Sequence, residues 1–131
     1  MEINKSLLGN LLEQAAASPR LRMNYDLRTS LEDGSQRMLN AMLPGTVLPI
    51  HRHTKTTEVL VLLRGKMEEI FYEENPLRET SRVLLEAGGS VQGLSIPIGQ
   101  WHGINVLEPT VILECKDGKY EPLGPEDMIS L

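Results

Sequence analysis

The histidines of this chain fall in two short segments, GTVLPIHRHTKTTEVLVLLRG (residues 45–65) and PIGQWHGIN (residues 97–105). His51 and His53 stand one residue apart, so both imidazoles project to the same side if this segment is extended. Glu58 follows a polar turn, and its carboxylate can reach the same side from the next strand. His102 lies far downstream, but in a closed barrel its strand can come beside the other two histidines.

These four side chains predict a metal site. Three neutral imidazoles and one carboxylate suit one divalent transition metal ion such as Fe, Zn, Ni or Mn, and the ligand types do not select among these metals. Four protein ligands leave one or two positions open for water or substrate. In the alternative interpretation, His51 and His53 are surface residues of an edge strand and His102 is a core histidine bonded to backbone. The clustering of these side chains favours the metal site.

The spacing of these ligands resembles two motifs of the cupin superfamily. The first motif is matched at every position by Gly45, His51, His53, Glu58 and Gly65, and the second by Pro97, Gly99 and His102. Gly93 precedes Pro97, and Asn105 follows His102, by fewer residues than in the family pattern. This departure affects the local turn geometry and not the ligands. The resemblance implies an all-β small cupin, a double-stranded β-helix or jelly-roll barrel, with one N-terminal α-helix.

A longer resemblance covers most of the chain. The runs AAASPRLRMNYDLRTSLEDGSQRMLNAMLPGT and ECKDGKYEPL are similar to the WbuC-type cupin fold metalloproteins, which occur among bacterial surface-polysaccharide genes. The chain departs from that family at Arg28, where the family has histidine, and in its last residues, EDMISL, which lack a tryptophan-containing tail. The resemblance implies a metal-binding cupin that acts on or binds a small polar, sugar-like molecule linked to surface polysaccharide metabolism. An iron-dependent dioxygenase-like cupin and a non-catalytic ligand-binding or sensing cupin stay open, so the sequence does not decide whether the protein is an enzyme.

Hydrophobic periodicity predicts the elements that position these residues. Apolar residues recur at helical spacing from Leu7 to Ala16, and Ser18-Pro19 ends the predicted helix. From Gln36 onward, short β-like runs alternate with Gly- and Pro-bearing turns, which indicates an antiparallel sandwich or barrel. We expect a single domain over residues 1–131, with a helical segment at 1–20, the cupin barrel at 21–122 and a loose C-terminal tail at 123–131.

Five further residues are candidates for a substrate pocket. Asn40 and Met42 share one face of a predicted strand, where they either contact a ligand or pack in the core. Arg64 either binds an anionic substrate or is an exposed strand-end arginine, and Trp101 either covers the mouth of the barrel or anchors it from outside. Glu114 alternates with Cys115, so at most one of the two faces inward. Beyond the ligands, only Glu69 and Glu114 are evident as inward-facing acids.

Composition bounds the partners. The formal charge is −5 and the basic residues form no cationic stripe, which argues against nucleic acid and anionic membranes as partners. The apolar runs are far shorter than the roughly 20 residues of a membrane helix. Cys115 is the sole cysteine and the N-terminal segment does not resemble a secretory signal, so we expect a cytoplasmic protein. A leucine-faced helix and an apolar outer sheet predict a homodimer. The small-molecule ligand is implied by the resemblance to the cupins.

Overall fold

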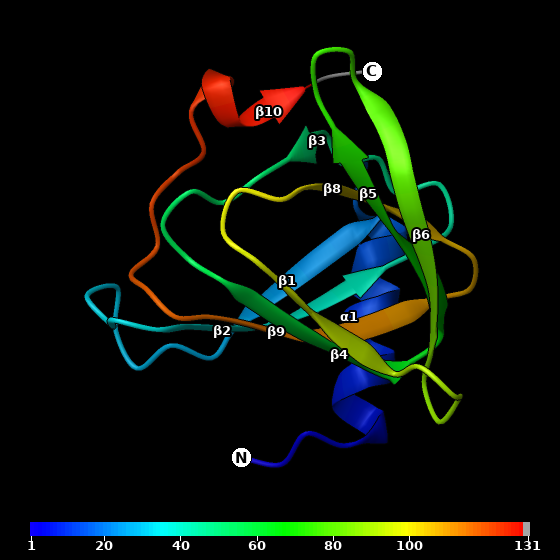
Figure 1. Cartoon of the computed structure of the whole chain (residues 1–131). Coiled ribbons are helices and arrows are strands. Elements are labelled where there is room, and N and C mark those ends of the chain that lie inside the picture. Colours follow the sequence, from blue (N-terminus) through cyan, green and yellow to red (C-terminus); the bar gives the residue numbers. More distant parts are fainter. Residues whose placement is uncertain (130–131) are drawn as a thin grey trace.

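The structure is a computed structural model and describes residues 1–129. It contains two five-stranded antiparallel sheets and one N-terminal α-helix (Figure 1), which confirms the predicted fold class. The first sheet has the spatial order β1 (Arg22–Asp26), β2 (Gln36–Met42), β9 (Thr110–Lys116), β4 (Glu58–Arg64) and β7 (Gly93–Ile96). The second has the order β10 (Met128–Ile129), β3 (Ile50–His51), β8 (Trp101–Val106), β5 (Lys66–Glu73) and β6 (Arg78–Glu86).

The helix α1 (Lys5–Ala17) covers the outer side of the first sheet over β1, β2 and β9. Its N-terminus is capped by Asn4, whose Oδ1 accepts a hydrogen bond of 3.0 Å from the backbone N–H of Leu7. Ser18 is extended because it precedes proline, and the helix ends there. The buried helical residues share one apolar cluster with the outer side of the sheet: Leu8, Leu11, Leu12, Ala15, Leu39, Ala41 and Val111.

A second apolar cluster holds the two sheets together. Its buried members come from both sheets: Met42, Leu60, Leu62, Met67, Leu85, Ile96, Val106 and Ile112. Strand β4 shows the alternation that the sequence predicts, since Glu58, Leu60 and Leu62 point inward and are buried. Its outward residues remain exposed. Full burial of one leucine or isoleucine side chain contributes about 1.5–3 kcal/mol, so this cluster fixes how the two sheets face each other.

The C-terminal segment is better ordered than the loose tail that we expected. A 3₁₀-helix, η1 (Pro125–Asp127), leads into β10, which pairs with β3 in the second sheet. Arg52 fastens this segment, because its Nε lies 2.9 Å from Asp127 Oδ1 and its guanidinium lies 4.5 Å from the ring centroid of Trp101. Residues 130–131 of the expected tail lie outside the described residues.

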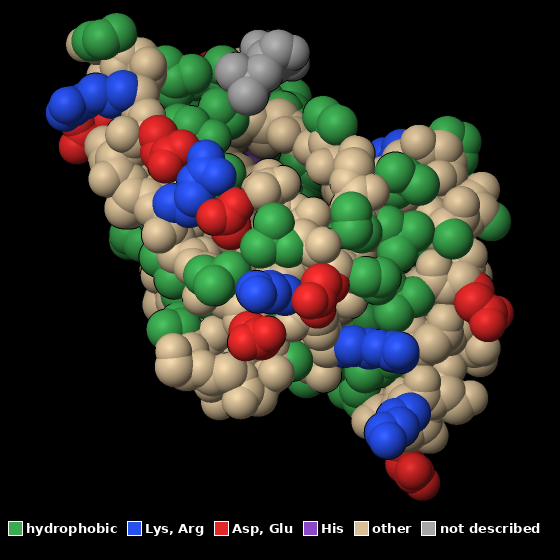
Figure 2. Space-filling model, turned by 90° about the vertical axis from the view of Figure 1, so that its right-hand side faces the viewer, with side chains coloured by type: hydrophobic (Ala, Val, Ile, Leu, Met, Phe, Trp, Pro, Cys, Tyr) green, Lys and Arg blue, Asp and Glu red, His purple; other side chains and the backbone are tan. Residues whose placement is uncertain are grey.

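The surface carries a mixture of side-chain types. On the face seen in Figure 2, groups of hydrophobic side chains lie between acidic and basic ones. Among residues 1–129, no helix is long and apolar enough to cross a membrane.

Candidate metal centre

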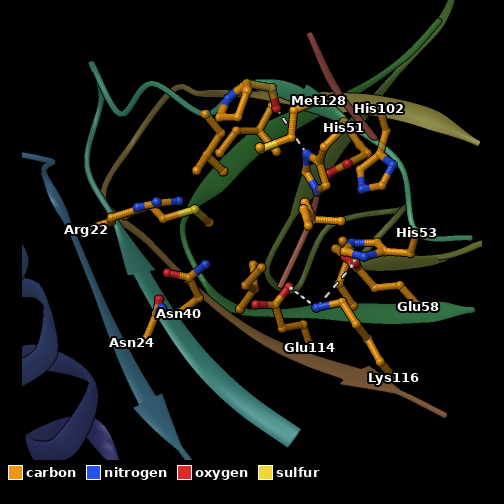
Figure 3. A pocket seen from close by; sticks show the side chains of 18 residues that line it. Arg22, Asn24, Asn40, His51, His53, Glu58, His102, Glu114, Lys116 and Met128 are labelled. Carbon is orange, nitrogen blue, oxygen red and sulfur yellow. Dashed lines mark hydrogen bonds and ion pairs between the residues drawn. The ribbon is translucent and has the colours of Figure 1, made fainter. Parts of the chain in front are cut away.

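A pocket of about 270 Å³ opens into the space between the two sheets. Its walls include all three histidines and several acidic side chains (Figure 3), and the acidic members are Glu58, Glu69 and Glu114. The histidines come from the second sheet and the loop that follows β3, whereas Glu58 comes from β4 in the first sheet. The pocket is therefore completed only when the two sheets pack face to face.

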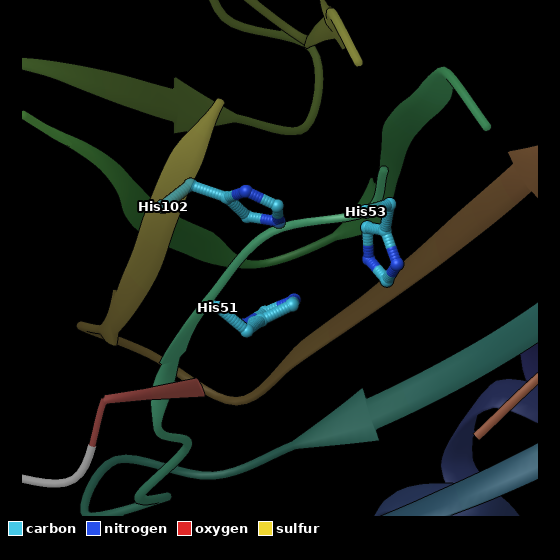
Figure 4. Close-up of side chains that lie close together, drawn as sticks. All are labelled: His51, His53 and His102. Atoms are coloured by element: carbon cyan, nitrogen blue, oxygen red, sulfur yellow. The ribbon is translucent and has the colours of Figure 1, made fainter. Parts of the chain in front are cut away.

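The three imidazoles converge within this pocket (Figure 4). His51 and His102 are register partners on β3 and β8, and their ring centroids lie 4.2 Å apart. His53 follows two residues after His51, with its ring centroid 5.1 Å from that of His51 and 5.7 Å from that of His102. One nitrogen from each ring can be chosen so that all three lie within 4.8 Å of one another. One ion can contact all three after small side-chain movements.

Backbone carbonyls orient two of the three rings. His51 Nδ1 lies 3.0 Å from the carbonyl oxygen of Pro49, and His102 Nδ1 lies 2.9 Å from that of Gln100. A carbonyl only accepts hydrogen bonds, so Nδ1 carries the proton in each ring and Nε2 presents its lone pair. This arrangement is typical of histidines that bind a metal, since it fixes both the tautomer and the ring orientation.

Burial also keeps these rings neutral. It lowers the pKa of His51 to about 4, with a further contribution from the neighbouring His102. Burial likewise lowers the pKa of His102. Both imidazoles are therefore unprotonated at neutral pH, which is the form that a metal ion requires.

Glu58 supplies the negative charge of the site. Its side chain is buried, and its Oε1 lies 3.3 Å from His53 Nε2 and 3.7 Å from Lys116 Nζ. Burial by itself raises the pKa of this carboxyl. The opposite effect of His53 and Lys116 is larger, so the pKa falls to about 2. His53 Nε2 is buried and has no hydrogen-bond partner of good geometry among residues 1–129. Three imidazole nitrogens and one ionised carboxylate form a donor set that fits a divalent transition metal.

Two more carboxyl groups line the pocket, on strands other than β4. Glu69 on β5 is 1% exposed, and its Oε2 has no partner among the described residues. Burial, followed by the charges of Glu58 and Glu114, raises its pKa well above the usual value. Burial and Glu58 also raise the pKa of Glu114, which lies 3.9 Å from Lys116 Nζ. Glu69 therefore keeps a proton to higher pH than an exposed glutamate does.

Three of the five predicted pocket residues line the pocket. Asn40 and Met42 do so from β2 and Glu114 from β9. Arg64 does not, because it follows a register shift at the end of β4 and its side chain is exposed. Trp101 does not line the pocket either: it is 5% exposed and packs beneath Arg52, since neighbours along a strand face opposite sides.

Three polar residues of the pocket were not among the predicted site residues. Arg22 and Asn24 line it from β1, and Lys116 lines it from β9. From the sequence, Arg20, Arg22 and Asn24 either close over the pocket or form a solvated strand or loop after the helix, and the second interpretation is slightly favoured. The period-two spacing of Arg22 and Asn24, which places both on one face of a strand, was the signal for the first.

Comparisons with known proteins show the family and the fold. Residues 3–84 match the family described as "Domain of unknown function (DUF6016)". No match was found among curated proteins. Similar solved structures include the capsular polysaccharide assembling protein CapF from Staphylococcus aureus, with a TM-score of 0.68 and 19% identity over 86% of this chain and 32% of CapF.

Two further neighbours support the same fold. An oxalate oxidase in complex with the substrate analogue glycolate has a TM-score of 0.62 and 17% identity over 81% of this chain and 55% of the oxidase. The cupin domain of Schizosaccharomyces pombe Cnp3 has a TM-score of 0.59 and 14% identity over 74% of this chain and 64% of that domain. The chain thus spans less than two thirds of each of these three structures. It has the cupin fold, and it belongs to the DUF6016 family.

Proposed function

We propose that this protein is a metal-binding cupin of the WbuC type. One divalent transition metal ion is held by His51, His53, His102 and Glu58, beside a pocket for a small polar, sugar-like molecule. The observation that carries this proposal is the convergence of three imidazoles, two of them oriented by backbone carbonyls, next to the buried Glu58 carboxylate.

The pocket contains groups that suit both binding and turnover. A bound ion supplies a Lewis acid that polarises a carbonyl or orients a pair of hydroxyls. Leu60, Ile104 and Ile112 supply apolar walls to the pocket. Glu69 is a group that can hold a proton inside the pocket and exchange it with a ligand. These residues fit a protein that acts on a small molecule, and binding without turnover uses the same contacts.

Two neighbours bear on the ligand. CapF is a capsular polysaccharide assembling protein, which favours a sugar-derived ligand in a pathway of surface polysaccharide. The oxalate oxidase neighbour binds the substrate analogue glycolate, a small hydroxy acid, and this favours metal-dependent oxidation of a small molecule as the second candidate function. A redox-active metal at this site is what separates the second candidate from the first.

Elemental analysis tests the metal site. The protein is purified without chelator or affinity tag, and metal is quantified per chain beside the triple variant His51→Ala, His53→Ala, His102→Ala. The control is Cys115→Ala, which removes a side chain that is able to bind metal but lies outside the pocket lining. We expect near-stoichiometric metal in the wild type and in the control, and none in the triple variant.

The identity of the metal then directs the next assay. Iron makes oxygen consumption the assay to run, and zinc, nickel or manganese favours Lewis-acid chemistry or binding. Unchanged metal in the triple variant contradicts the ligand assignment. No metal in the wild type, even after incubation with divalent ions, contradicts the proposal as a whole.

We also propose that the chain forms a homodimer through the outer side of β4. Val59, Val61 and Leu63 point outward there and are 46%, 39% and 36% exposed, while α1 covers β1, β2 and β9 instead. Sedimentation analysis of Val61→Glu tests this surface, because a buried glutamate at the interface shifts the protein to monomers. A wild-type protein that sediments as a monomer contradicts it.

A further inference from the structure

We infer that the pocket binds a monosaccharide-sized polyol that carries one anionic group. The anionic group, a carboxylate or a phosphate, lies at Arg22 and Asn24, and the hydroxyls extend past Asn40 toward the histidines. This inference deepens the proposed function, since it names the class of ligand for the same site.

The pocket has a second polar end, away from the histidines. Arg22 and Asn24 line it from β1 and Asn40 from β2, and Asn24 and Asn40 are register partners across the two strands. In Figure 3 these three side chains lie on one side of the pocket, with His53 and Glu58 across from them. A ligand that contacts both ends must therefore carry polar groups at both of its own ends.

Asn40 indicates that part of the ligand is a hydrogen-bond donor. Asn40 lines the pocket beside the Glu114 carboxyl and is 7% exposed, and its Oδ1 has no hydrogen-bond partner among residues 1–129. Leaving a buried polar atom unpaired costs about 1–3 kcal/mol, so such atoms are normally paired. A sugar hydroxyl that enters the pocket can donate to this oxygen, which an anion alone cannot do.

The charges in the pocket place the anion at β1. The pocket-lining residues of β1 and β2 are Arg22, Asn24, Asn40 and Met42, and none of these is acidic. The acidic lining residues come from β4, β5 and β9, where Lys116 lies 3.7 Å from Glu58 and 3.9 Å from Glu114. Lys116 is thus engaged with carboxylates. The guanidinium of Arg22 is the cation at the opposite end, and its planar fork matches the oxygens of a carboxylate or a phosphate.

The size of the pocket limits the ligand. A volume of about 270 Å³ lies just below the usual range for ligand pockets, which begins at roughly 300 Å³. A single sugar ring with one substituent suits this volume, whereas an oligosaccharide does not. The pocket therefore fits a soluble precursor better than the polymer itself.

Three sugars that differ at one carbon test the inference. D-glucuronate, D-glucose 6-phosphate and D-glucose share the pyranose ring and carry a carboxylate, a phosphate ester or a hydroxymethyl group. Each is titrated by calorimetry into the full chain, both metal-loaded and chelator-treated. We expect at least one of the two anionic sugars to bind about tenfold or more tightly than glucose, as a charged hydrogen bond implies. The anionic sugar that is preferred identifies the anion as carboxylate or phosphate.

Matched variants assign the preference to Arg22. Arg22→Met keeps the aliphatic stem and removes the charge, and we expect it to abolish the preference over glucose. Arg20→Met is the control, because Arg20 is exposed and lies outside the pocket lining, and we expect it to keep the preference. Asn40→Asp provides a second, near-isosteric change. Its negative charge should weaken the binding of both anionic sugars more than the binding of glucose. Metal content and melting temperature of each variant show whether it folds.

The outcomes separate this inference from the proposed function. Three outcomes overturn the inference and leave the metal site standing. These are equal affinity for the three sugars, no binding of any of them to either form of the protein, and a preference that survives in Arg22→Met. If the wild type holds no metal but the chelator-treated protein keeps an Arg22-dependent preference, the proposed metal function fails and the inference stands.

Discussion

Replacement of Glu58 by glutamine is the most informative single change at the candidate metal centre. The side chain keeps its shape and loses its charge, next to Lys116 and His53. In the folded protein its pKa falls from the usual 4.5 to about 2, because His53 and Lys116 outweigh the effect of burial. One pKa unit corresponds to about 1.4 kcal/mol, so the ionised carboxylate contributes roughly 3 kcal/mol to the free energy of unfolding at pH 7.

The pH dependence of this contribution has a definite sign. The folded pKa lies below the unfolded one, so the stabilisation is fully present above pH 4.5 and is lost as the pH falls through about 2. We expect Glu58→Gln to lower the free energy of unfolding by roughly 3 kcal/mol at pH 7, and by less than about half of that at pH 3.

Urea unfolding of chelator-treated protein at the two pH values measures this difference, free of any metal. Glu13→Gln is the matched control, because Glu13 is exposed on α1, and it should change the free energy of unfolding by less than about 0.5 kcal/mol. Equal stability of wild type and Glu58→Gln at pH 7 would refute the reasoning. A gap of the same size at pH 7 and pH 3 would also do so, since it would show that the cost comes from shape and not from charge.

Three further changes have expected outcomes. Burial is the main reason that the pKa of Glu69 is raised, so the wild type loses stability as the pH rises from 4.5 toward the folded pKa. Glu69→Gln should therefore have a higher melting temperature than the wild type between pH 5 and pH 8. Gly65→Ala should lower the free energy of unfolding in urea by about 3 kcal/mol or more, because φ of Gly65 is +93° and a Cβ would overlap neighbouring backbone. Gly88→Ala should lower it by only about 1–2 kcal/mol, because φ of Gly88 is +73° but the space around it is open. Arg52→Met should speed hydrogen exchange at residues 128–129, because it removes the ion pair with Asp127; unchanged exchange there would show that β10 is held by its pairing with β3 alone.

Local pattern was sufficient to predict the parts of the fold that depend on periodicity. The leucine face of α1 and the alternation along β4 each follow from spacing within one segment, and the structure has both. The approach of His51 to His102 needs a barrel as well, because the two residues are paired across strands that are distant in sequence. The resemblance of the histidine and glutamate spacing to the cupin motifs supplied that condition.

Other features depend on contacts that the sequence does not display. Strand β10 contains two residues, too few for any period, and it exists because β3 offers a free edge and Arg52 holds Asp127. Arg64 does not line the pocket because the register shifts after Leu62, and simple alternation does not predict such a shift. Trp101 is different, since strict alternation from His102 already places it on the outside of the sheet.

Metal binding and folding are linked in this protein because the site residues come from two sheets. His51 and His102 belong to the second sheet and Glu58 to the first, so no single hairpin contains the donor set. The apolar cluster between the sheets holds them face to face, so an ion that binds donors from both sheets must stabilise the same packing. At a free metal concentration one hundred times its dissociation constant, this linkage adds about 2.7 kcal/mol to the free energy of unfolding. Core substitutions between the sheets should therefore weaken metal affinity without touching a ligand, whereas substitutions under α1, on the other side of the first sheet, should lower stability and leave the affinity of the folded protein unchanged.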